Sequence, residues 1–205
     1  MGTGSLTLLD YRRRVAELYA DVRSAARSRG PAQAHELWRT ARDELYATHP
    51  DSPLAPDDAR RRTGLPVAPY DPDLRWELPV EAAEPHQLDV TTGTDGEVVF
   101  HRLGRVATPL GPLDLWWLAG YGGGVWLPVR DASSGSSSYG GGRYLLDTVK
   151  GADLGGGGDG SGDGTVVVDL NFLYNPSCAY DPAWACPLAP PGNRLQAPVE
   201  AGELT

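Results

Sequence analysis

Apolar residues in the first fifty positions recur at spacings of three and four, the period of an amphipathic helix. The pattern predicts one helix over residues 6–28 and a second over 31–48, separated by Gly30 and Pro31. Pro31 suits the first turn of the second helix. The apolar positions are Leu8, Tyr11, Val15, Leu18, Val22 and Ala26 in the first helix and Ala34, Leu37, Trp38, Ala41 and Leu45 in the second. Such a hairpin must pack its apolar faces against the rest of the chain.

Beyond an irregular, proline-rich segment at 53–73, with one predicted helical turn at 57–62, short runs of β-forming residues recur between turn signals. Asp95-Gly96 is the strongest hairpin signal among them. The predicted strands are Leu74–Val80, Gln87–Thr92, Glu97–Leu103, Arg105–Leu110, Leu113–Ala119, Val125–Arg130, Arg143–Val149, Thr165–Leu170 and Leu195–Val199. A sheet of many short strands has open edges unless it closes into a barrel or other parts of the chain cover those edges. We therefore predict a mainly β (α+β) fold, a small antiparallel β-barrel or sandwich with the N-terminal helical hairpin packed outside.

This pattern divides the chain into a helical hairpin and linker at 1–64 and a β-barrel-like domain at 65–205. The β domain contains a glycine-rich loop at 151–164, which lacks the Gly-Lys-Ser/Thr of a phosphate loop and is predicted to be flexible. A segment rich in proline and holding both cysteines, residues 175–194, is called the lid here. Its prolines stiffen it, and we expect it to cross one mouth of the barrel.

Charge is unevenly distributed along the chain, which carries a net charge of −9. Residues 1–62 carry 11 arginines and 9 acidic groups, and the remainder carries 7 basic and 18 acidic groups. The acidic β domain argues against nucleic acid and anionic membranes as partners. The arginines of the first segment alternate with acids and are interpreted as a solvated helix face.

No apolar run approaches the ~20 residues that span a bilayer, and the N-terminus reverses the charge order of a secretory signal. The protein is therefore expected to be cytoplasmic. Cys178 and Cys186 are then expected to be thiols, with a disulfide across the short loop as the alternative. A reactive thiol is the least expected role, because no His or Lys is adjacent to either cysteine.

The stretch at 128–146 is the first candidate site, because small residues there end in three glycines followed by an arginine. Glycines allow close backbone approach, and the guanidinium fork of Arg143 suits a carboxylate or phosphate. The alternative is a buried ion pair of Arg143 with Asp131 or Asp169 that holds loops together. The candidate ligand-binding residues here are Arg143, Ser134, Gly140, Gly141 and Gly142.

A second group of polar residues follows the predicted strand at 165–170. Asp169 and Asn171 alternate with Leu170, so both point to one face. In an apolar cavity the carboxylate would have a raised pKa suited to acid–base chemistry; the alternative is an Asx-type turn. Asp169, Tyr139 and Asp131 are the candidate catalytic residues, and Asn171, Asn175 and Glu203 complete the candidate ligand-binding set.

Other site chemistries have little support. The four histidines, His35, His49, His86 and His101, are scattered without ligand spacing, so no metal is predicted. No dinucleotide fingerprint follows a strand and no nucleophile elbow is present, so neither a cofactor nor serine hydrolysis is predicted.

Three blocks in the second half form a specific combination: RDASSG at 130–135 with YGGGRYL at 139–145, DLN at 169–171 with YNPSC at 174–178, and CPL at 186–188 with PPGNRL at 190–195 and AGE at 201–203. Together they resemble a bacterial and archaeal family known only as domain of unknown function 1684. Val129 and Leu170 stand where the family pattern has Phe, and the glycine-rich segment at 155–164 is additional. The resemblance supports the location of a site and implies no reaction.

The sequence thus predicts a small-molecule site, for a ligand with an anionic group, in or at the mouth of a β-barrel. A metal-independent acid–base enzyme and a non-catalytic ligand-binding or protein-interaction module both satisfy this prediction. The sequence leaves open whether the ligand is turned over and whether the chain forms a homo-oligomer.

Overall fold

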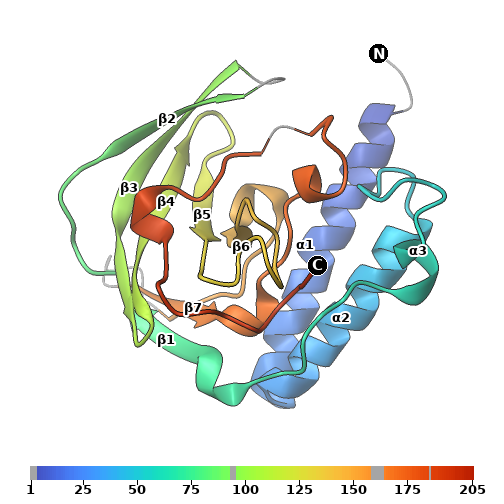
Figure 1. Cartoon of the computed structure of the whole chain (residues 1–205), viewed down its shortest axis with the longest axis horizontal. Helices are drawn as coiled ribbons and strands as arrows, with labels where there is room; N and C mark the ends of the chain where they lie inside the picture. The colour runs from blue at the N-terminus through green and yellow to red at the C-terminus, as the bar shows by residue number, and fades with distance from the viewer. Residues whose placement is uncertain (1–3, 93–95, 158–163, 185) are drawn as a thin grey trace.

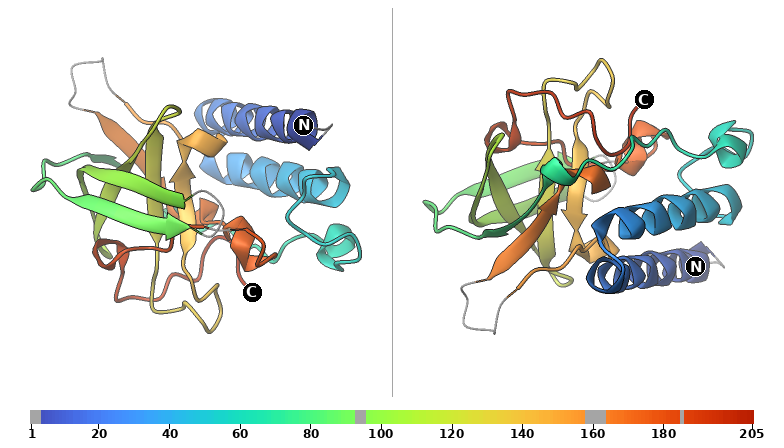
Figure 2. Two further views of the ribbon diagram at one scale, coloured as in Figure 1. Left: turned by 90° about the horizontal axis from the view of Figure 1, so that it is seen from above. Right: turned by 90° about the horizontal axis from the view of Figure 1, so that it is seen from below.

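The computed structural model describes residues 4–92, 96–157, 164–184 and 186–205. Its N-terminal part is a helical hairpin made of α1 (Gly4–Ser28) and α2 (Pro31–Thr48), which lie side by side in Figure 2. Gly30 adopts a φ of 102°, which glycine tolerates, and Pro31 opens the second helix. A single short turn, α3 (Arg60–Thr63), follows. The predicted hairpin is therefore confirmed.

Two antiparallel sheets make up the rest of the fold (Figure 1). The larger has the order β2-β3-β4-β5-β6, and β1 pairs with β7 in the smaller. The bounds are β1 Arg75–Pro79, β2 Gln87–Thr92, β3 Gly96–Thr108, β4 Gly111–Ala119, β5 Gly124–Val129, β6 Arg143–Asp147 and β7 Thr165–Asp169. The predicted α+β fold with sandwich-like sheets is confirmed. The barrel alternative is not realised, because β2 and β6 form opposite edges of the larger sheet in the described chain.

Two strand predictions differ from the structure. The runs on either side of Gly104 form one strand, β3, because a bulge between Arg102 and Gly104 absorbs the irregularity while pairing with β4 continues. A Cβ at Gly104 would lie 2.5 Å from the Glu81 carbonyl oxygen, so glycine is needed there. The run at 195–199 forms no strand; only a bridge between Arg130 and Arg194 lies beside it. Asp95 of the predicted hairpin turn lies outside the described residues, although β2 and β3 pair on both sides of it.

One hydrophobic core joins the hairpin to the sheets. Val22 and Trp38 of the helices are buried in the same cluster as Leu127, Leu145 and Leu170. The helices cover one side of the sheets, as the two views of Figure 2 show. The hairpin thus packs outside the sheets, as predicted, and its inner face supplies part of the core.

The first part of the glycine-rich loop is paired with β7. Gly155 and Gly157 accept hydrogen bonds from Val167 and Thr165 at 2.9 and 2.7 Å. Residues 158–163 lie outside the described chain, so their predicted flexibility stays a prediction.

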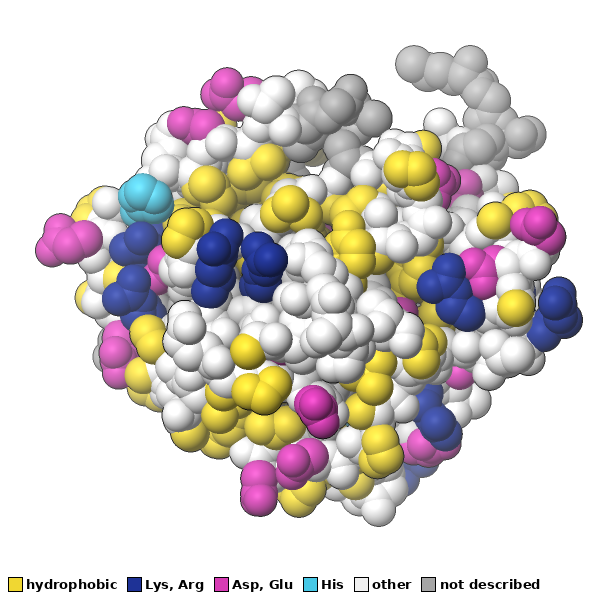
Figure 3. Space-filling model, viewed as in Figure 1, with side chains coloured by type: hydrophobic (Ala, Val, Ile, Leu, Met, Phe, Trp, Pro, Cys, Tyr) yellow, Lys and Arg dark blue, Asp and Glu magenta, His cyan; other side chains and the backbone are white. Residues whose placement is uncertain are grey.

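On the face shown in Figure 3, acidic and basic side chains alternate with exposed hydrophobic ones. None of the helices described is both long and apolar enough to span a bilayer.

Candidate functional site

A cavity of about 530 Å³ lies between the helical hairpin and the lid. This volume falls within the range of small-molecule sites. The side chains that line it and matter below are Tyr11, Arg12, Val15 and Tyr19 of α1, Trp38, Arg42 and Tyr46 of α2, Asp51, Lys150, Tyr174 and Asn175, and the lid residues Ser177, Asp181, Ala183, Trp184 and Cys186. The site is therefore built by residues from both ends of the sequence.

Helical spacing produces one wall of this cavity. Tyr11, Val15 and Tyr19 are four residues apart on α1, so they stack along one face. Trp38, Arg42 and Tyr46 repeat the same spacing on α2. The arginine therefore occupies an apolar stripe, with aromatic neighbours one turn before and one turn after it.

Arg42 is a buried charged residue in the lining of the cavity. Its side chain is 7% exposed and forms a 2.7 Å ion pair with Glu203, which is fully buried. The guanidinium lies 4.6 Å from the ring centroid of Tyr46 and 5.5 Å from that of Tyr174. Burial opposes the charge, but Glu203 and the surrounding tyrosines raise the pKa of Arg42 well above its ordinary value. Arg42 is thus a permanent buried cation.

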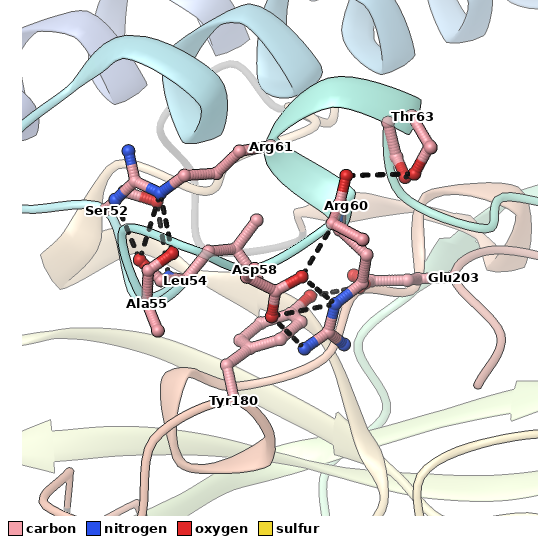
Figure 4. A network of polar contacts seen from close by, with 11 residues as sticks. Ser52, Leu54, Ala55, Asp58, Arg60, Arg61, Thr63, Tyr180 and Glu203 are labelled. Carbon is pink, nitrogen blue, oxygen red and sulfur yellow. Dashed lines mark hydrogen bonds and ion pairs between the residues drawn. The ribbon is translucent and has the colours of Figure 1, made fainter.

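Glu203 is held by hydrogen bonds from Tyr180 and Asn175. Tyr180 donates its hydroxyl hydrogen to Oε1, and the backbone N–H of Asn175 donates to Oε2 at 3.0 Å. Figure 4 shows Arg60 beside the Tyr180 ring, 5.1 Å from its centroid, with Asp58 holding the guanidinium at 2.6 Å. Because both oxygens of Glu203 have protein partners, its role is to hold and orient Arg42.

Three buried polar atoms of residues that line the cavity have no partner in the described chain. Six buried side-chain nitrogen or oxygen atoms lack a hydrogen bond in the described chain, and three of them belong to residues that line this cavity. These three are Arg42 Nη1, Asp51 Oδ2 and Asn175 Oδ1. An unpaired buried polar atom costs about 1–3 kcal/mol. Half of the unpaired buried side-chain atoms in the described chain therefore belong to residues that line one cavity.

Three tyrosine hydroxyls around the cavity are neutral. Burial raises the pKa of Tyr11, Tyr19 and Tyr174 above the ordinary phenol value. The Tyr19 oxygen accepts a hydrogen bond from the Trp38 indole at 3.2 Å. The aromatic walls therefore combine flat apolar surface with polar tips that stay protonated at neutral pH.

The structure places Arg143 elsewhere. This side chain is fully buried and forms a 2.9 Å ion pair with Asp131. Its Nη atoms also donate to the backbone oxygens of Ala201, Glu203 and Val199. Burial opposes ionisation of Asp131, but hydrogen bonds from Ser133 and Val199 lower its pKa, with a further contribution from Arg143. The geometry favours the alternative stated above, an ion pair that holds the C-terminal segment, and an anion-binding role for Arg143 stays a prediction.

The small-residue loop before Arg143 uses many of its own amides internally. The N–H groups of Gly135 and Gly142 donate to the carbonyls of Ser138 and Tyr139. Ser134 accepts from the Asp131 amide at 3.3 Å through its hydroxyl. Gly142 has a φ of 87° and lies against the Val129 carbonyl, and Gly141 lies against the Tyr139 ring. Gly140, which precedes both, packs against Gly135. These contacts support a tight turn, and ligand binding by the loop stays untested.

Asp169 and Asn171 form a third polar group, at the end of β7. Asp169 accepts hydrogen bonds from the Asn171 backbone at 3.2 Å and side chain at 2.8 Å. Burial raises the pKa of Asp169 to about 6, against the hydrogen bonds from Asn171. The Asn171 side chain also bonds both the N–H and the carbonyl of Asp71 at 2.8 Å. The Asx-type turn is therefore present, and neither residue lines the cavity.

Of the predicted site residues, Asn175 lines the cavity, and Glu203 is linked to it through the ion pair with Arg42. Tyr139 lies near it only through the lid, with its hydroxyl 3.9 Å from Cys178 Sγ, and burial raises its pKa to about 12. The helix residues of the site were missed, and the interpretation of the early arginines as a solvated face is wrong for Arg42. The signal was present in the sequence: Arg42 lies four residues from both Trp38 and Tyr46 on the apolar stripe.

Two comparisons with known proteins bear on this site. The sequence model of the family described as a protein of unknown function (DUF1684) matches residues 61–204, which include Asn175 and Glu203 but not Arg42. The solution NMR structure of an uncharacterized protein of Haloarcula marismortui is similar, with 32% identity and a TM-score of 0.55 over 82% of this chain and 90% of that one. No curated protein matches the chain.

Proposed function

This chain belongs to the DUF1684 family, and because the function of that family is unknown, we propose from the site alone that the chain binds a small amphipathic molecule in the cavity between hairpin and lid. This cavity is distinct from the site predicted at Gly140–Gly142 and Arg143, none of which line it. The activity proposed for it is binding.

The observation that carries the proposal is the concentration of unpaired buried atoms in residues that line the cavity. Arg42 Nη1 is a donor without an acceptor, and Asn175 Oδ1 is an acceptor without a donor. A ligand that supplies a carbonyl or carboxylate oxygen to Arg42 and an N–H or O–H to Asn175 would satisfy both. These two groups would orient the ligand in the cavity.

The body of the ligand is inferred from the aromatic walls. The rings of Tyr11, Tyr19, Trp38 and Tyr174 offer flat surfaces that favour a planar or branched apolar group. Because Glu203 already balances the charge of Arg42, the oxygen-bearing end does not need a full negative charge. A carboxylate and a primary amide both fit, and the anionic ligand expected from the sequence is the first of these.

Isothermal titration calorimetry with three probes of one skeleton tests this proposal. Naphthylacetate, naphthylacetamide and ethylnaphthalene share an apolar body and differ in the group that reaches Arg42. We expect the acid and the amide to bind at least about tenfold more tightly than the hydrocarbon, since each adds hydrogen bonds to otherwise unpaired groups. Equal affinities, or no binding of any probe, would contradict the proposal.

A matched pair of variants locates the binding. Arg42→Met removes the donor at the cavity. Arg102→Met is the control, because Arg102 also carries an unpaired buried nitrogen, pairs with a carboxylate (Asp114, at 3.3 Å) and lies over a tryptophan, but does not line the cavity. We expect only Arg42→Met to weaken naphthylacetamide binding. The same loss in both variants would mean that a general loss of structure, and not the site, is responsible.

A further inference from the structure

The lid carries two thiols that contact each other. Cys178 lies in a short helical turn, Ser177–Ala179, and Cys186 lies eight residues later. Both are free and partly buried. The backbone N–H of Cys178 donates to Cys186 Sγ at 3.4 Å, and the Tyr139 hydroxyl lies 3.9 Å from Cys178 Sγ. The two cysteines stand at opposite ends of one loop, and the fold brings them into contact.

The two thiols have different environments. The Cys178 thiol hydrogen-bonds the Cys186 sulfur, and this contact, with the Cys178 amide and Lys150, lowers the pKa of Cys186 to about 6 against the effects of burial and Asp147. The same contact raises the pKa of Cys178. The expectation that neither thiol is activated considered only neighbours in the sequence, whereas the activating groups of Cys186 are brought to it by the fold. Cys186 also lines the cavity.

Cys186 therefore has the properties of an attacking thiolate, and Cys178 those of a resolving thiol. A thiolate near neutral pH with a second thiol in contact is the arrangement that converts oxidation into a disulfide. The residues between the two cysteines include Asp181, Ala183 and Trp184, all of which line the cavity. A bond between the ends of this loop would restrict the part of the lid that covers the site.

We propose that Cys186 and Cys178 form a reversible disulfide on reaction with a hydroperoxide, and that this bond fixes the lid over the cavity; the consequence for the ligand rests on the proposed function.

The reaction balances with the hydroperoxide as oxidant. The Cys186 thiolate attacks the terminal oxygen, the O–O bond breaks, and the alkoxide leaves and takes up a proton as the alcohol. Cys186 is then a sulfenic acid. The Cys178 sulfur attacks the Cys186 sulfur, the S–S bond forms, the S–O bond breaks, and water leaves with the thiol proton. Two thiols are oxidised by two electrons, and the hydroperoxide is reduced to an alcohol and water.

The chemistry is tested with hydrogen peroxide on reduced wild type, Cys178→Ser and Cys186→Ser. We expect wild type to lose both thiols and two hydrogens in intact mass, without dimerising. Cys178→Ser should accumulate a sulfenic acid that dimedone traps at Cys186, and Cys186→Ser should react about tenfold more slowly than wild type. Retention of both thiols in wild type, or equal rates of reaction with peroxide in wild type and Cys186→Ser, would overturn the proposed disulfide chemistry.

The proposal that the disulfide fixes the lid is tested by amide hydrogen exchange, which needs no ligand. We expect the amides of Ala179, Tyr180, Asp181, Ala183 and Trp184 to exchange about tenfold more slowly in the oxidised than in the reduced protein, because the bridge removes open conformations of the loop. Cys178→Ser with and without peroxide is the control and should show no such change. Equal exchange rates in oxidised and reduced wild type would overturn the proposal that the disulfide fixes the lid. Naphthylacetamide binding to neither form would overturn the proposed function, so the two failures are distinguishable.

Discussion

Two buried arginines, Arg42 and Arg143, tie the C-terminal segment to the rest of the molecule, and their surroundings differ. Arg143 pairs with Asp131 and donates to three backbone carbonyls, away from the cavity. Arg42 pairs with Glu203, is surrounded by tyrosines and lines the cavity. Each arginine keeps one buried nitrogen unpaired, Nη1 in Arg42 and Nε in Arg143. A buried arginine with an unpaired donor therefore indicates a ligand site only where it also lines a cavity.

The largest effect is expected from Arg143→Met. Removing this partner leaves Asp131 charged and buried, which costs about 3–5 kcal/mol in free energy of unfolding. Urea denaturation measures the loss, and Arg105→Met, at an ion pair whose arginine is 40% exposed, is the control with an expected loss below about 1 kcal/mol. A loss of stability in Arg143→Met no greater than in Arg105→Met would contradict the structural role of Arg143.

Asp169 extends the comparison to a buried carboxylate whose arginine, Arg75, is 3.6 Å away. Its pKa is raised from 3.8 to about 6, so the folded protein binds this proton more tightly than the unfolded chain. The stability it contributes is present below pH 4 and lost as the pH rises to about 6, a change of about 3 kcal/mol.

Unfolding free energies of wild type and Asp169→Asn across this pH range isolate the contribution of Asp169. We expect the wild type to lose stability relative to the variant as the pH rises. A constant difference between the two proteins would show that Asp169 is not desolvated as described.

Arg42→Met should cost less stability than Arg143→Met, about 2 kcal/mol. The cavity beside Arg42 gives water access to the Glu203 carboxylate that loses its partner, which lowers the penalty for an unpaired buried charge. The same urea series measures it. A loss equal to that of Arg143→Met would indicate that the two ion pairs have the same structural role.

The smallest effect on stability, and the most selective one on binding, is expected from Asn175→Leu. This change removes an acceptor that has no partner in the folded chain and one weak donor contact of 3.3 Å to the Leu204 carbonyl. The free energy of unfolding should change by less than about 1 kcal/mol, while naphthylacetamide binds about tenfold more weakly. Unchanged affinity would exclude Asn175 from the site.

The sequence predicted elements better than it predicted the site, for physical reasons. The helix at 31–48 and the strand at 87–92 were predicted with the bounds that the structure has, because local periodicity and Gly-Pro or turn residues determine them. Gly104 divided one strand into two in the prediction, since the bulge that continues the pairing depends on the partner strand.

The site depends on contacts between distant segments. Asn175 and Glu203 were predicted from the C-terminal motifs, whereas Arg42 was missed because its partner lies at the other end of the chain. The Arg143–Asp131 pair was foreseen as an alternative, but the sequence does not show whether a buried arginine adjoins a cavity. That property is decided by packing.

The most direct test of the central claim is a titration of the ¹⁵N-labelled protein with naphthylacetamide, followed by amide and indole shifts. We predict saturable shifts at the Trp184 indole and at Asn175 and Ala183, with Gly140–Gly142 unmoved. Shifts centred on Gly140–Gly142 and Arg143, with the lid residues unmoved, would contradict the account and place the ligand site at Gly140–Arg143.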